Sequence, residues 1–242
     1  MFWTRRPKTR RDLVTAGDRA RAKGRVKSAV AAYRKALSQP DPDDPHVHGK
    51  LAPLLAQLED GAGAMASFRR AAAGHLQTGF LERALSIYLQ ARHAFPLEPE
   101  FHSEAARVHL VRGRRADAAI VLAQGGRALG RTRRPEGIEM LRCALGLQPG
   151  HVEATLALAP LLRKEGQPDE AWKLLVRIEP GLRGAALRRA RWEMLRAAPG
   201  FRAGYRWIAA LLTADGHRKP RPAVRAGASR RTHRGEAPEN SR

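Results

Sequence analysis

The chain has little of what marks secreted, membrane-spanning or wide-cored proteins. Among its 242 residues there is one cysteine, Cys143, which excludes an internal disulfide framework and fits a reducing compartment. No apolar run approaches the roughly 20 residues that a membrane-spanning helix needs. The basic start, Met1 to Arg6, is followed by no apolar stretch, so a signal peptide is not expected. We therefore expect a cytoplasmic protein.

Aromatic residues are scarce, at 5% of the chain, whereas alanine is abundant. A core built from few large rings and many methyl groups favours slim, closely packed helices and disfavours a single wide core. The composition thus favours closely packed helices, and the length fits either one globular domain or one extended solenoid.

Acidic residues are outnumbered, with 23 Asp and Glu against 45 Lys and Arg, a net charge of +22. Residues 1–44 carry 12 basic against 5 acidic side chains and residues 217–242 carry 8 against 2, so the two ends supply +13. Basic ends of this kind attract nucleic acid. The preference for Arg over Lys is also typical of a GC-rich coding sequence, so composition leaves both explanations open.

Residues 79–96 show a helical pattern most clearly. Ala84, Tyr88 and Ala91 recur at i, i+4 and i+7, so they share one helix face, and Pro96 ends the helix. One large ring between small residues suits a helix that packs closely against two neighbours. We expect this stretch to pack rather than to bind.

The chain repeats itself every 53–54 residues. Residues 45–98 and 99–151 align on each other, and Leu51-Ala-Pro-Leu-Leu55 returns letter for letter as Leu158-Ala-Pro-Leu-Leu162. Self-similarity at a fixed period is the signature of a solenoid. We expect helices at about 46–58, 62–77 and 80–94 in one unit, a third helix of the final unit at about 182–197, and a last helix at about 202–214. The expected division is a disordered basic leader 1–11, units over 12–43, 45–98, 99–151 and 152–201, a capping helix 202–216 and a disordered basic tail 217–242.

The spacing Ala-x3-aromatic-x2-Ala-x4-Pro resembles the second helix of the tetratricopeptide repeat (TPR), and the resemblance covers about 12–216. It implies an all-α fold, a right-handed α-α superhelix. The family's usual period is about 34 residues, so each unit here holds an extra helix, and the middle helix serves two pairs. The residues expected to pack the repeats are Ala29, Tyr33, Ala36, Ala64, Phe68, Ala84, Tyr88, Ala91, Ala118, Leu122, Leu141, Ala144, Ala171 and Leu175.

The resemblance also implies a concave groove that binds peptides or protein surfaces, lined chiefly by the first helix of each pair. Some family members clamp a peptide's terminal carboxylate with Lys and Asn, and this chain has neither set in place. The candidate groove residues are Val14, Asp18, Arg21, Gly49, Pro53, Ser103, Arg107, Leu156 and Arg163.

Catalytic and metal-binding constellations are missing from the sequence. His46 and His48 are only two residues apart, and His102 and His109 have no third ligand at zinc-like spacing. Cys143 lies next to a packing alanine and is expected to be a small buried residue. We expect no enzymatic activity, no cofactor, no metal and no small-molecule substrate.

Three roles remain open. We favour a non-catalytic adaptor or scaffold that binds a peptide or protein with an acidic surface. The alternative is charge-driven binding of nucleic acid, and a third possibility is peripheral membrane contact through Phe2, Trp3 and the basic leader. The arginine clusters that would serve the alternative as a basic patch are Arg112, Arg114, Arg115, Arg131, Arg133 and Arg134.

Overall fold

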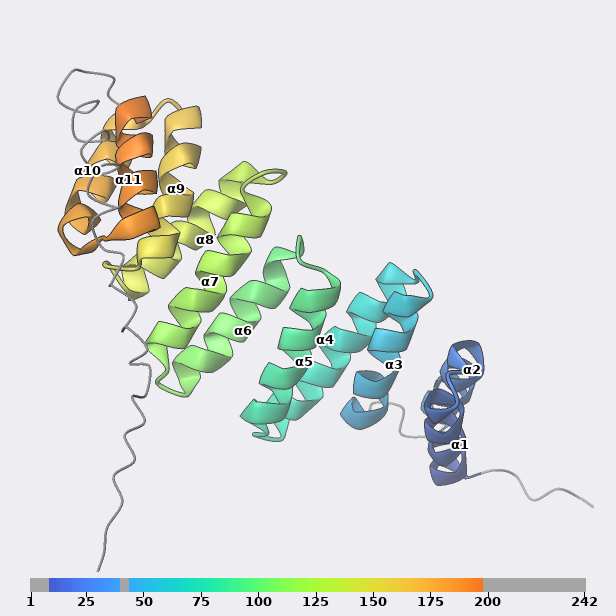
Figure 1. Cartoon of the computed structure of the whole chain (residues 1–242). Helices are drawn as coiled ribbons and strands as arrows, with labels where there is room; N and C mark the ends of the chain where they lie inside the picture. The colour runs from blue at the N-terminus through green and yellow to red at the C-terminus, as the bar shows by residue number, and fades with distance from the viewer. Residues whose placement is uncertain (1–8, 40–43, 198–242) are drawn as a thin grey trace, which may run out of the picture.

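The computed structural model of the chain describes residues 9–39 and 44–197, and these form eleven α-helices and one short 3-10 turn, with no strand among them. The helices follow one another in an extended row from α1 to α11 (Figure 1). The all-α solenoid expected from the sequence is confirmed. The elements are α1 (Arg10–Ala22), α2 (Val26–Leu37), α3 (Pro45–Gln57), α4 (Gly61–Gln77), α5 (Leu81–Ala94), α6 (Pro99–Val111), α7 (Arg115–Leu129), α8 (Arg134–Leu147), α9 (Val152–Lys164), α10 (Pro168–Ile178), the 3-10 turn η1 (Glu179–Gly181) and α11 (Gly184–Ala197).

Five of the turns between neighbouring helices are built alike. In each, one residue adopts a positive φ, and the next backbone N–H donates to the carbonyl five residues earlier at 2.8–3.0 Å. This is the Schellman ending of a helix, which favours glycine because a Cβ is strained there. Glu59 is the one non-glycine residue that takes this conformation among those the structure describes. The five residues are Gly24, Glu59, Gly79, Gly113 and Gly166.

The helices alternate between two layers. Helix α3 contacts α5 as well as α4, α7 contacts α9, and α9 contacts α11. Hydrogen bonds and ion pairs link most helices to the next but one on both sides of the solenoid. In the odd-numbered layer these are Lys50–Asp18, Arg92–Gln124, Arg127–Glu153 and Arg189–Leu156 (backbone O), and in the even-numbered layer Arg34–Asp60, Arg69–Glu100 and Arg142–Glu170.

Helices α3 to α11 form three units of three helices, within residues 45–98, 99–151 and 152–201, which we call the first, the middle and the third unit. Their period of three helices does not match the alternation between two layers. Equivalent helices of successive units, α3, α6 and α9, fall in the odd, the even and again the odd layer. Each middle helix contacts both of its neighbours, as α4 contacts α3 and α5. A residue's place in the repeat therefore sets its burial, whereas the unit it belongs to sets the side of the solenoid on which it lies.

All fourteen residues expected to pack the repeats are buried. Tyr33 anchors the core around α1–α4, and Phe68 anchors the larger core that runs on to α11. The ring of Phe68 lies 6.4 Å from that of Phe95 and 6.3 Å from that of Phe101, both close to edge-to-face, an arrangement that aromatic rings favour. Few aromatic residues thus suffice, because each serves two or more helices.

Helices α7 and α8 approach closely through glycine. A Cβ on Gly137 would lie 2.8 Å from the backbone of Gly130 and 2.9 Å from the carbonyl of Gly126. Backbone cannot move aside as a side chain can. The middle unit therefore closes tightly where the sequence has glycine in place of the larger residues of the other units.

The structure changes some of the expected boundaries and placements. Helix α1 already begins at Arg10, inside the expected leader, because Thr9 and Asp12 form a reciprocal capping box at its start. Cys143 is exposed rather than buried, since α8 turns Leu141 and Ala144 inward and Cys143 outward. The capping helix 202–216, the tail 217–242, Phe2 and Trp3 lie outside the described residues.

Pro53 and Pro160 both lie inside helices, as the repeated Leu-Ala-Pro-Leu-Leu segment requires. Each helix continues through its proline. Among residues 9–39 and 44–197, no helix combines the length and the apolar character needed to cross a bilayer.

Candidate binding groove

Two adjoining hollows lie on the odd-numbered layer, at the junction of α1, α3 and α5. One has a volume of about 320 Å³ and the other about 690 Å³, and both are lined by Pro53, Ser86 and Gln90. They therefore form one continuous depression, which we name the α3–α5 groove. Its smaller part, the cationic end, adds Arg21, Pro45, His46, Gly49, Lys50, His75, Arg83 and Ile87, and its larger part, the apolar end, adds Ala56, Gln57, Phe68, Leu89, His93 and Ala94.

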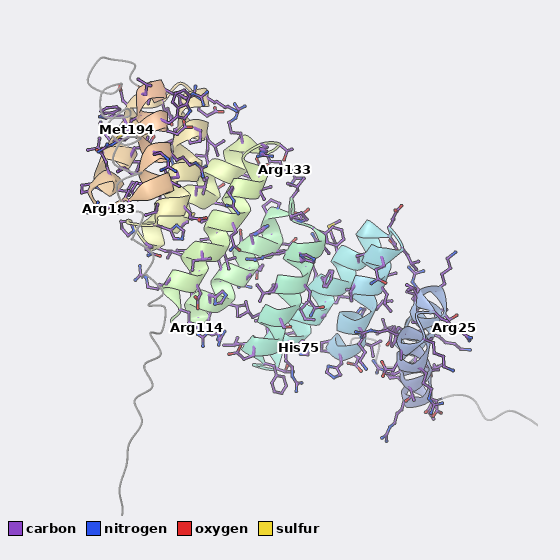
Figure 2. The ribbon with its side chains drawn as sticks, viewed as in Figure 1. Arg25, His75, Arg114, Arg133, Arg183 and Met194 are labelled. Atoms are coloured by element: carbon purple, nitrogen blue, oxygen red, sulfur yellow. The ribbon has the colours of Figure 1, made fainter. Side chains whose placement is uncertain are left out.

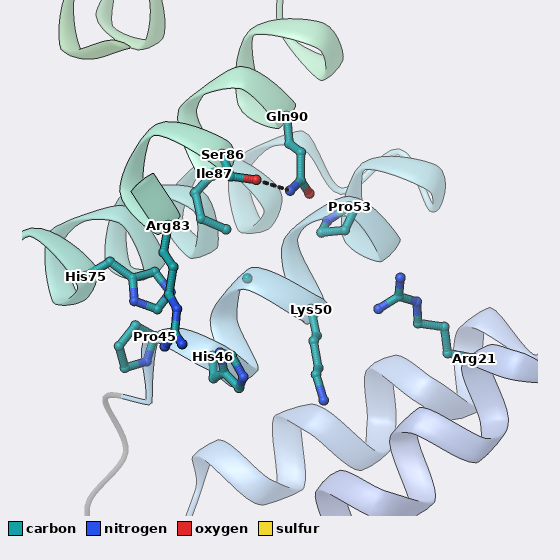
Figure 3. A pocket seen from close by; sticks show the side chains of 11 residues that line it. Arg21, Pro45, His46, Lys50, Pro53, His75, Arg83, Ser86, Ile87 and Gln90 are labelled. Atoms are coloured by element: carbon teal, nitrogen blue, oxygen red, sulfur yellow. Dashed lines mark hydrogen bonds between the residues drawn. The ribbon is translucent and has the colours of Figure 1, made fainter. Parts of the chain in front are cut away.

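Helix α5 supplies one wall of the groove. Arg83, Ser86 and Gln90 recur at i, i+3 and i+7, so they line one face, whereas Ala84 and Ala91 are buried in the core. The side-chain amide of Gln90 lies 3.5 Å from the hydroxyl of Ser86 along this wall (Figure 3). Helix α5 therefore packs through one face and leaves the other open to the groove, and the expectation that it only packs stays a prediction.

Gly49 allows α5 to come close to α3. A Cβ at this position would lie 3.0 Å from Cδ1 of Ile87 and 3.8 Å from Cβ of Ala71. A longer side chain at this position would fill the floor of the cationic end. The groove thus depends on the absence of a side chain in the middle of α3.

Pro53 changes the hydrogen bonding of the same stretch of α3. Proline has no N–H, so the carbonyl of the residue four positions earlier, Gly49, receives no α-helical bond from it. Both residues line the cationic end. A residue of the groove lining, Gly49, therefore carries a carbonyl that lacks the helical hydrogen bond from position 53.

The cationic end is built from groups of one sign. None of the eleven described residues that line it is an Asp or a Glu. Figure 3 shows Arg83 reaching from α5 toward Pro45 and His46, and Lys50 and Arg21 extending into the space between α3 and α1. Such a depression has a positive potential and attracts anionic groups.

Lys50 is held by a carboxylate just outside the lining. Its Nζ lies 2.9 Å from both carboxylate oxygens of Asp18, and the hydroxyl of Tyr33 donates to the same carboxylate at 2.7 Å. Burial alone would raise the pKa of Asp18, but these two hydrogen bonds outweigh it and lower the pKa. Burial, with Asp18 alongside, raises the pKa of Tyr33 to about 12. The ion pair fixes α1 against α3 and sets the position of Lys50.

Two imidazoles lie at the mouth of the cationic end. The rings of His46 and His75 are 6.3 Å apart and meet edge to face. Burial lowers the pKa of His75, with smaller contributions from His46 and Arg83, while Asp44 opposes them. Asp44 accepts hydrogen bonds from the first backbone N–H groups of α3.

The apolar end has Phe68 in its floor and aliphatic groups at its rim. Phe68 is almost fully buried, exposing 1% of its surface, whereas Leu89 exposes 40%. Pro53 and Ala56 form the α3 wall. Such a hollow offers an apolar side chain a surface that is already in place.

The equivalent place in the third unit is closed. Leu156 stands where the first unit has Gly49, and its side chain is buried, with 5% exposed. The guanidinium of Arg189, the equivalent of Arg83, donates at 3.4 Å to the carbonyl of Leu156, the one that Pro160 leaves without a helical donor. Trp192 stands at the position of Ser86. Trp192 exposes 43% of its surface, so the buried Leu156 and the contact of Arg189 with its carbonyl are what close this place in the third unit.

The predicted groove residues fall into three groups. Arg21, Gly49 and Pro53 line the α3–α5 groove, and Asp18 holds Lys50 beside it. Val14 is half-buried on α1, where it packs against the core of the first helices, and Arg163 is half-buried on α9.

The other three predicted positions are not part of this groove. Leu156 is in the core, so its side chain is not offered to a ligand. Ser103 and Arg107 are exposed on α6, in the even-numbered layer, and Arg107 lines a separate hollow with Leu76 and Leu81. They lie on the other side of the solenoid because the layer changes from one unit to the next.

The arginine clusters do not form one patch. Arg114 and Arg133 lie at opposite ends of α7, on opposite edges of the solenoid (Figure 2). Arg112 pairs with Glu82, Arg114 approaches Asp117 at 3.9 Å, and Arg134 pairs with Glu165 at 2.7 Å. A large part of the charge in these turns is therefore matched by carboxylates of the solenoid itself.

The histidines serve the helix packing. His102 is buried, and its Nε2 lies 3.0 Å from the carbonyl oxygen of Pro96, at the join between α5 and α6. His109 is buried near Asp117, with 3.8 Å between the closest atoms. In the part of the chain that the structure describes, no three His, Cys, Asp or Glu side chains are grouped to hold a metal ion.

Comparison of the sequence with models of protein families shows to which family the repeats belong. The tetratricopeptide-repeat model matches residues 14–74 and 74–125, that is from α1 to α7. This part of the chain belongs to the tetratricopeptide-repeat family. The two matches meet in the last turn of α4. The TPR helices α1, α3 and α5 carry the groove.

Solved structures with a similar arrangement of helices are themselves helical-repeat proteins. PilW, a type IV pilus biogenesis factor, is 17% identical, with 88% of this chain and 96% of PilW covered and a TM-score of 0.37. MamA is 16% identical over 78% of this chain and 93% of its own, with a TM-score of 0.35. A thermophilic TPR protein of Thermus thermophilus is 22% identical over 84% and 100%, with a TM-score of 0.25. A search of curated sequences finds no match. At this level these similarities say nothing of what the chain binds.

Proposed function

We propose that this TPR protein is a non-catalytic adaptor that binds a peptide or protein segment in the α3–α5 groove. The observation that carries the proposal is the continuity of a cationic hollow with an apolar one across α1, α3 and α5. Both hollows are open in the first unit, while the matching place in the third unit is filled. The groove is thus open between α3 and α5, whereas the equivalent place between α9 and α11 is closed. This contrast supports a binding site for a partner in the first unit.

Two features favour a polypeptide over a small molecule. The groove is shallow and runs along two helices, so it offers a series of contacts rather than one enclosed cavity. It also combines charged groups, a backbone acceptor and an apolar surface, the mixture that a peptide can satisfy at once. The cytoplasm is the compartment we propose, in keeping with a single free cysteine.

Nucleic-acid binding is the second candidate and has less in its favour. Its basic leader and tail fall largely outside the described residues, and the arginine turns lie at opposite edges of the solenoid. It makes a different prediction, because affinity carried by phosphate contacts falls steeply with added salt and does not depend on the groove.

The test is affinity capture with a variant that fills the groove. Ser86→Trp copies the residue that the third unit has at this position, Trp192, onto the exposed wall of α5. Arg115→Glu, at the exposed first residue of α7, is the matched control on a distant surface. Proteins retained by the unmodified chain and by Arg115→Glu, but lost with Ser86→Trp, would support the proposal.

Nuclease treatment separates the two candidates. Partners that disappear on nuclease treatment, and that are retained equally by Ser86→Trp, would replace the adaptor proposal with nucleic-acid binding. Circular dichroism would show that each variant keeps its helix content, so that lost binding is not lost folding.

A further inference from the structure

We infer that the α3–α5 groove selectively binds an extended peptide segment in which acidic side chains lie three to five residues from one apolar anchor. This inference rests on the proposed function and names the class of ligand. The acidic side chains would occupy the cationic end, the anchor would occupy the apolar end, and a backbone N–H between them would donate to the carbonyl of Gly49.

The acidic part of the segment follows from the lining of the cationic end. Arg21, Lys50 and Arg83 reach it from three different helices, and none of its described lining residues is acidic. Asp18 already engages one face of Lys50, so the segment meets an ammonium that is held in place rather than a loose one. Charge fixed before binding gives specificity and a faster approach of the partner.

The backbone contact follows from Pro53. The carbonyl of Gly49 lacks the N–H that an ordinary residue at position 53 would give it. In the third unit the equivalent carbonyl, that of Leu156, is reached from α11 by Arg189. In the third unit, therefore, a side-chain donor from α11 reaches the α9 carbonyl that is equivalent to that of Gly49.

The apolar anchor follows from the other end of the groove. Pro53, Ala56 and Leu89 surround a hollow over Phe68 that has about twice the volume of the cationic one. A leucine or phenylalanine side chain suits such a surface, because its burial is the main favourable term of a small apolar contact. A charged side chain would lose its hydration there without gaining a partner.

The spacing follows from the length of α5 along the groove. Arg83 marks the cationic end and Leu89 to His93 the apolar end, six to ten residues further along. At about 1.5 Å per residue of helix, these points are about 9–15 Å apart. An extended peptide covers about 3.3 Å per residue, so about three to five residues bridge the two ends.

The experiment measures the binding of fluorescent synthetic peptides to the full chain by fluorescence anisotropy. The first peptide carries two adjacent aspartates and a leucine four residues beyond them, joined by glycine and serine, with both termini blocked. Blocking removes the terminal carboxylate, so only side-chain charge is presented. Companion peptides replace the aspartates with lysines, replace the leucine with glycine, or place the leucine one or nine residues from the aspartates, and each sequence is also made in reverse order.

The inference expects the first peptide, in one of its two directions, to bind at least about tenfold more tightly than each companion. Arg83→Glu should weaken this binding about tenfold, while Arg115→Glu, the same charge change on a distant surface, should leave it within about twofold. Pro53→Ala returns an N–H to the Gly49 carbonyl and should weaken binding about two- to fivefold, whereas Pro160→Ala should not.

Other results would overturn the inference. If the lysine peptides bind as well as the aspartate peptides, the charge assignment fails; if the leucine or its spacing has no effect, the anchor assignment fails. Competition by a single-stranded oligonucleotide that removes all peptides equally would indicate a general polyanion surface instead. If no peptide binds while Ser86→Trp still abolishes protein capture, the acid–anchor rule is wrong and the proposed groove function stands.

Discussion

The first helices of the first and third units share the segment Leu-Ala-Pro-Leu-Leu and lie in the same layer of the solenoid. Nevertheless, the space beside this segment is open in the first unit and closed in the third. In the first unit Gly49 and Ser86 leave a groove between α3 and α5. In the third unit Leu156 and Trp192 stand at these positions, and Arg189 crosses from α11 to α9. The backbones are alike, so the difference comes from a few side chains.

The comparison shows how a repeat protein can obtain one binding site from several similar units. The packing face must be kept in every unit, because neighbours stack on it. The opposite face carries no such constraint, and small residues at two positions are enough to open it. The middle unit stands apart, since its first helix, α6, lies in the other layer and has Ser103 and Arg107 at the places of Gly49 and Pro53.

The largest single loss of stability should appear when the floor of the groove is removed. Phe68→Ala is expected to cost about 3–5 kcal/mol of the free energy of unfolding, because Phe68 is buried and its ring meets two others. Leu175→Ala, the same position in the third unit, should cost about 2–4 kcal/mol. Urea unfolding followed by circular dichroism measures both. Equal costs would mean that the aromatic contacts add nothing to the first unit.

A second pair of variants tests the open and the filled position directly. Leu156→Ala should destabilise the chain by about 2–4 kcal/mol, since it leaves a cavity in the core. Gly49→Ala should change stability by less than about 1 kcal/mol, because the gain in helix propensity offsets a tight contact with the end of the Ile87 side chain. Urea unfolding again provides the measurement. A large loss for Gly49→Ala would show that the approach of α5 to α3 has no room to adjust.

The packing of this solenoid could be predicted from its sequence, because packing follows local periodicity. The helix expected at 46–58 is α3 (Pro45–Gln57), and that expected at 62–77 is α4 (Gly61–Gln77). Small residues around one ring, as at Ala84, Tyr88 and Ala91, identify the buried face in each repeat. These signals lie within one helix, and no knowledge of the neighbours is needed to interpret them.

The groove could be predicted only in part, because it depends on which layer each helix joins. Gly49 and Pro53 were expected and line the groove, but Ser103 and Arg107 were transferred from them by repeat equivalence and lie on the other side. An odd number of helices per unit reverses the side at each step. Arg83, Ser86 and Gln90 were missed, although their i, i+3, i+7 spacing on α5 marks a second helix face.

The two prolines offer a test in which both units should respond alike. Replacing either Pro53 or Pro160 with alanine restores a helical N–H, so each variant should gain about 1–2 kcal/mol of stability despite the freer unfolded chain. Thermal unfolding of the single and double variants would measure the gains and their additivity. Should either substitution destabilise the chain, the proline ring makes packing contacts that outweigh the lost hydrogen bond.

Acid pH should lower the stability of some helices more than that of others. Burial lowers the pKa of His75 on α4 and of His102 on α6 below the ordinary 6.5, so the folded state takes up protons less readily than the unfolded chain. Their contribution to stability is present above pH 6.5 and is lost as pH falls through the lowered pKa values. Hydrogen exchange from about pH 7.5 to about pH 5 should therefore show protection lost in α4 and α6.

A neutral replacement provides the control for the acid effect. His102→Gln keeps a donor for the carbonyl of Pro96 but does not titrate, so it should reduce the fall in melting temperature between neutral and acid pH. An unchanged fall would mean that other groups carry the acid sensitivity.

The smallest effect concerns the two equivalent arginines. Arg189→Met removes the donor to the Leu156 carbonyl, a long contact at 3.4 Å, and should cost about 0.5–1 kcal/mol, because that carbonyl lies under the third unit's own side chains. Arg83→Met should change the free energy of unfolding by less than about 0.5 kcal/mol, because the groove is open and water can take the place of the removed guanidinium. Urea unfolding of the two variants side by side measures the difference. If Arg83→Met costs as much as Arg189→Met, the contact of the Arg83 guanidinium with the ring of Phe80, 4.6 Å from the ring centre, contributes as much as the hydrogen bond of Arg189.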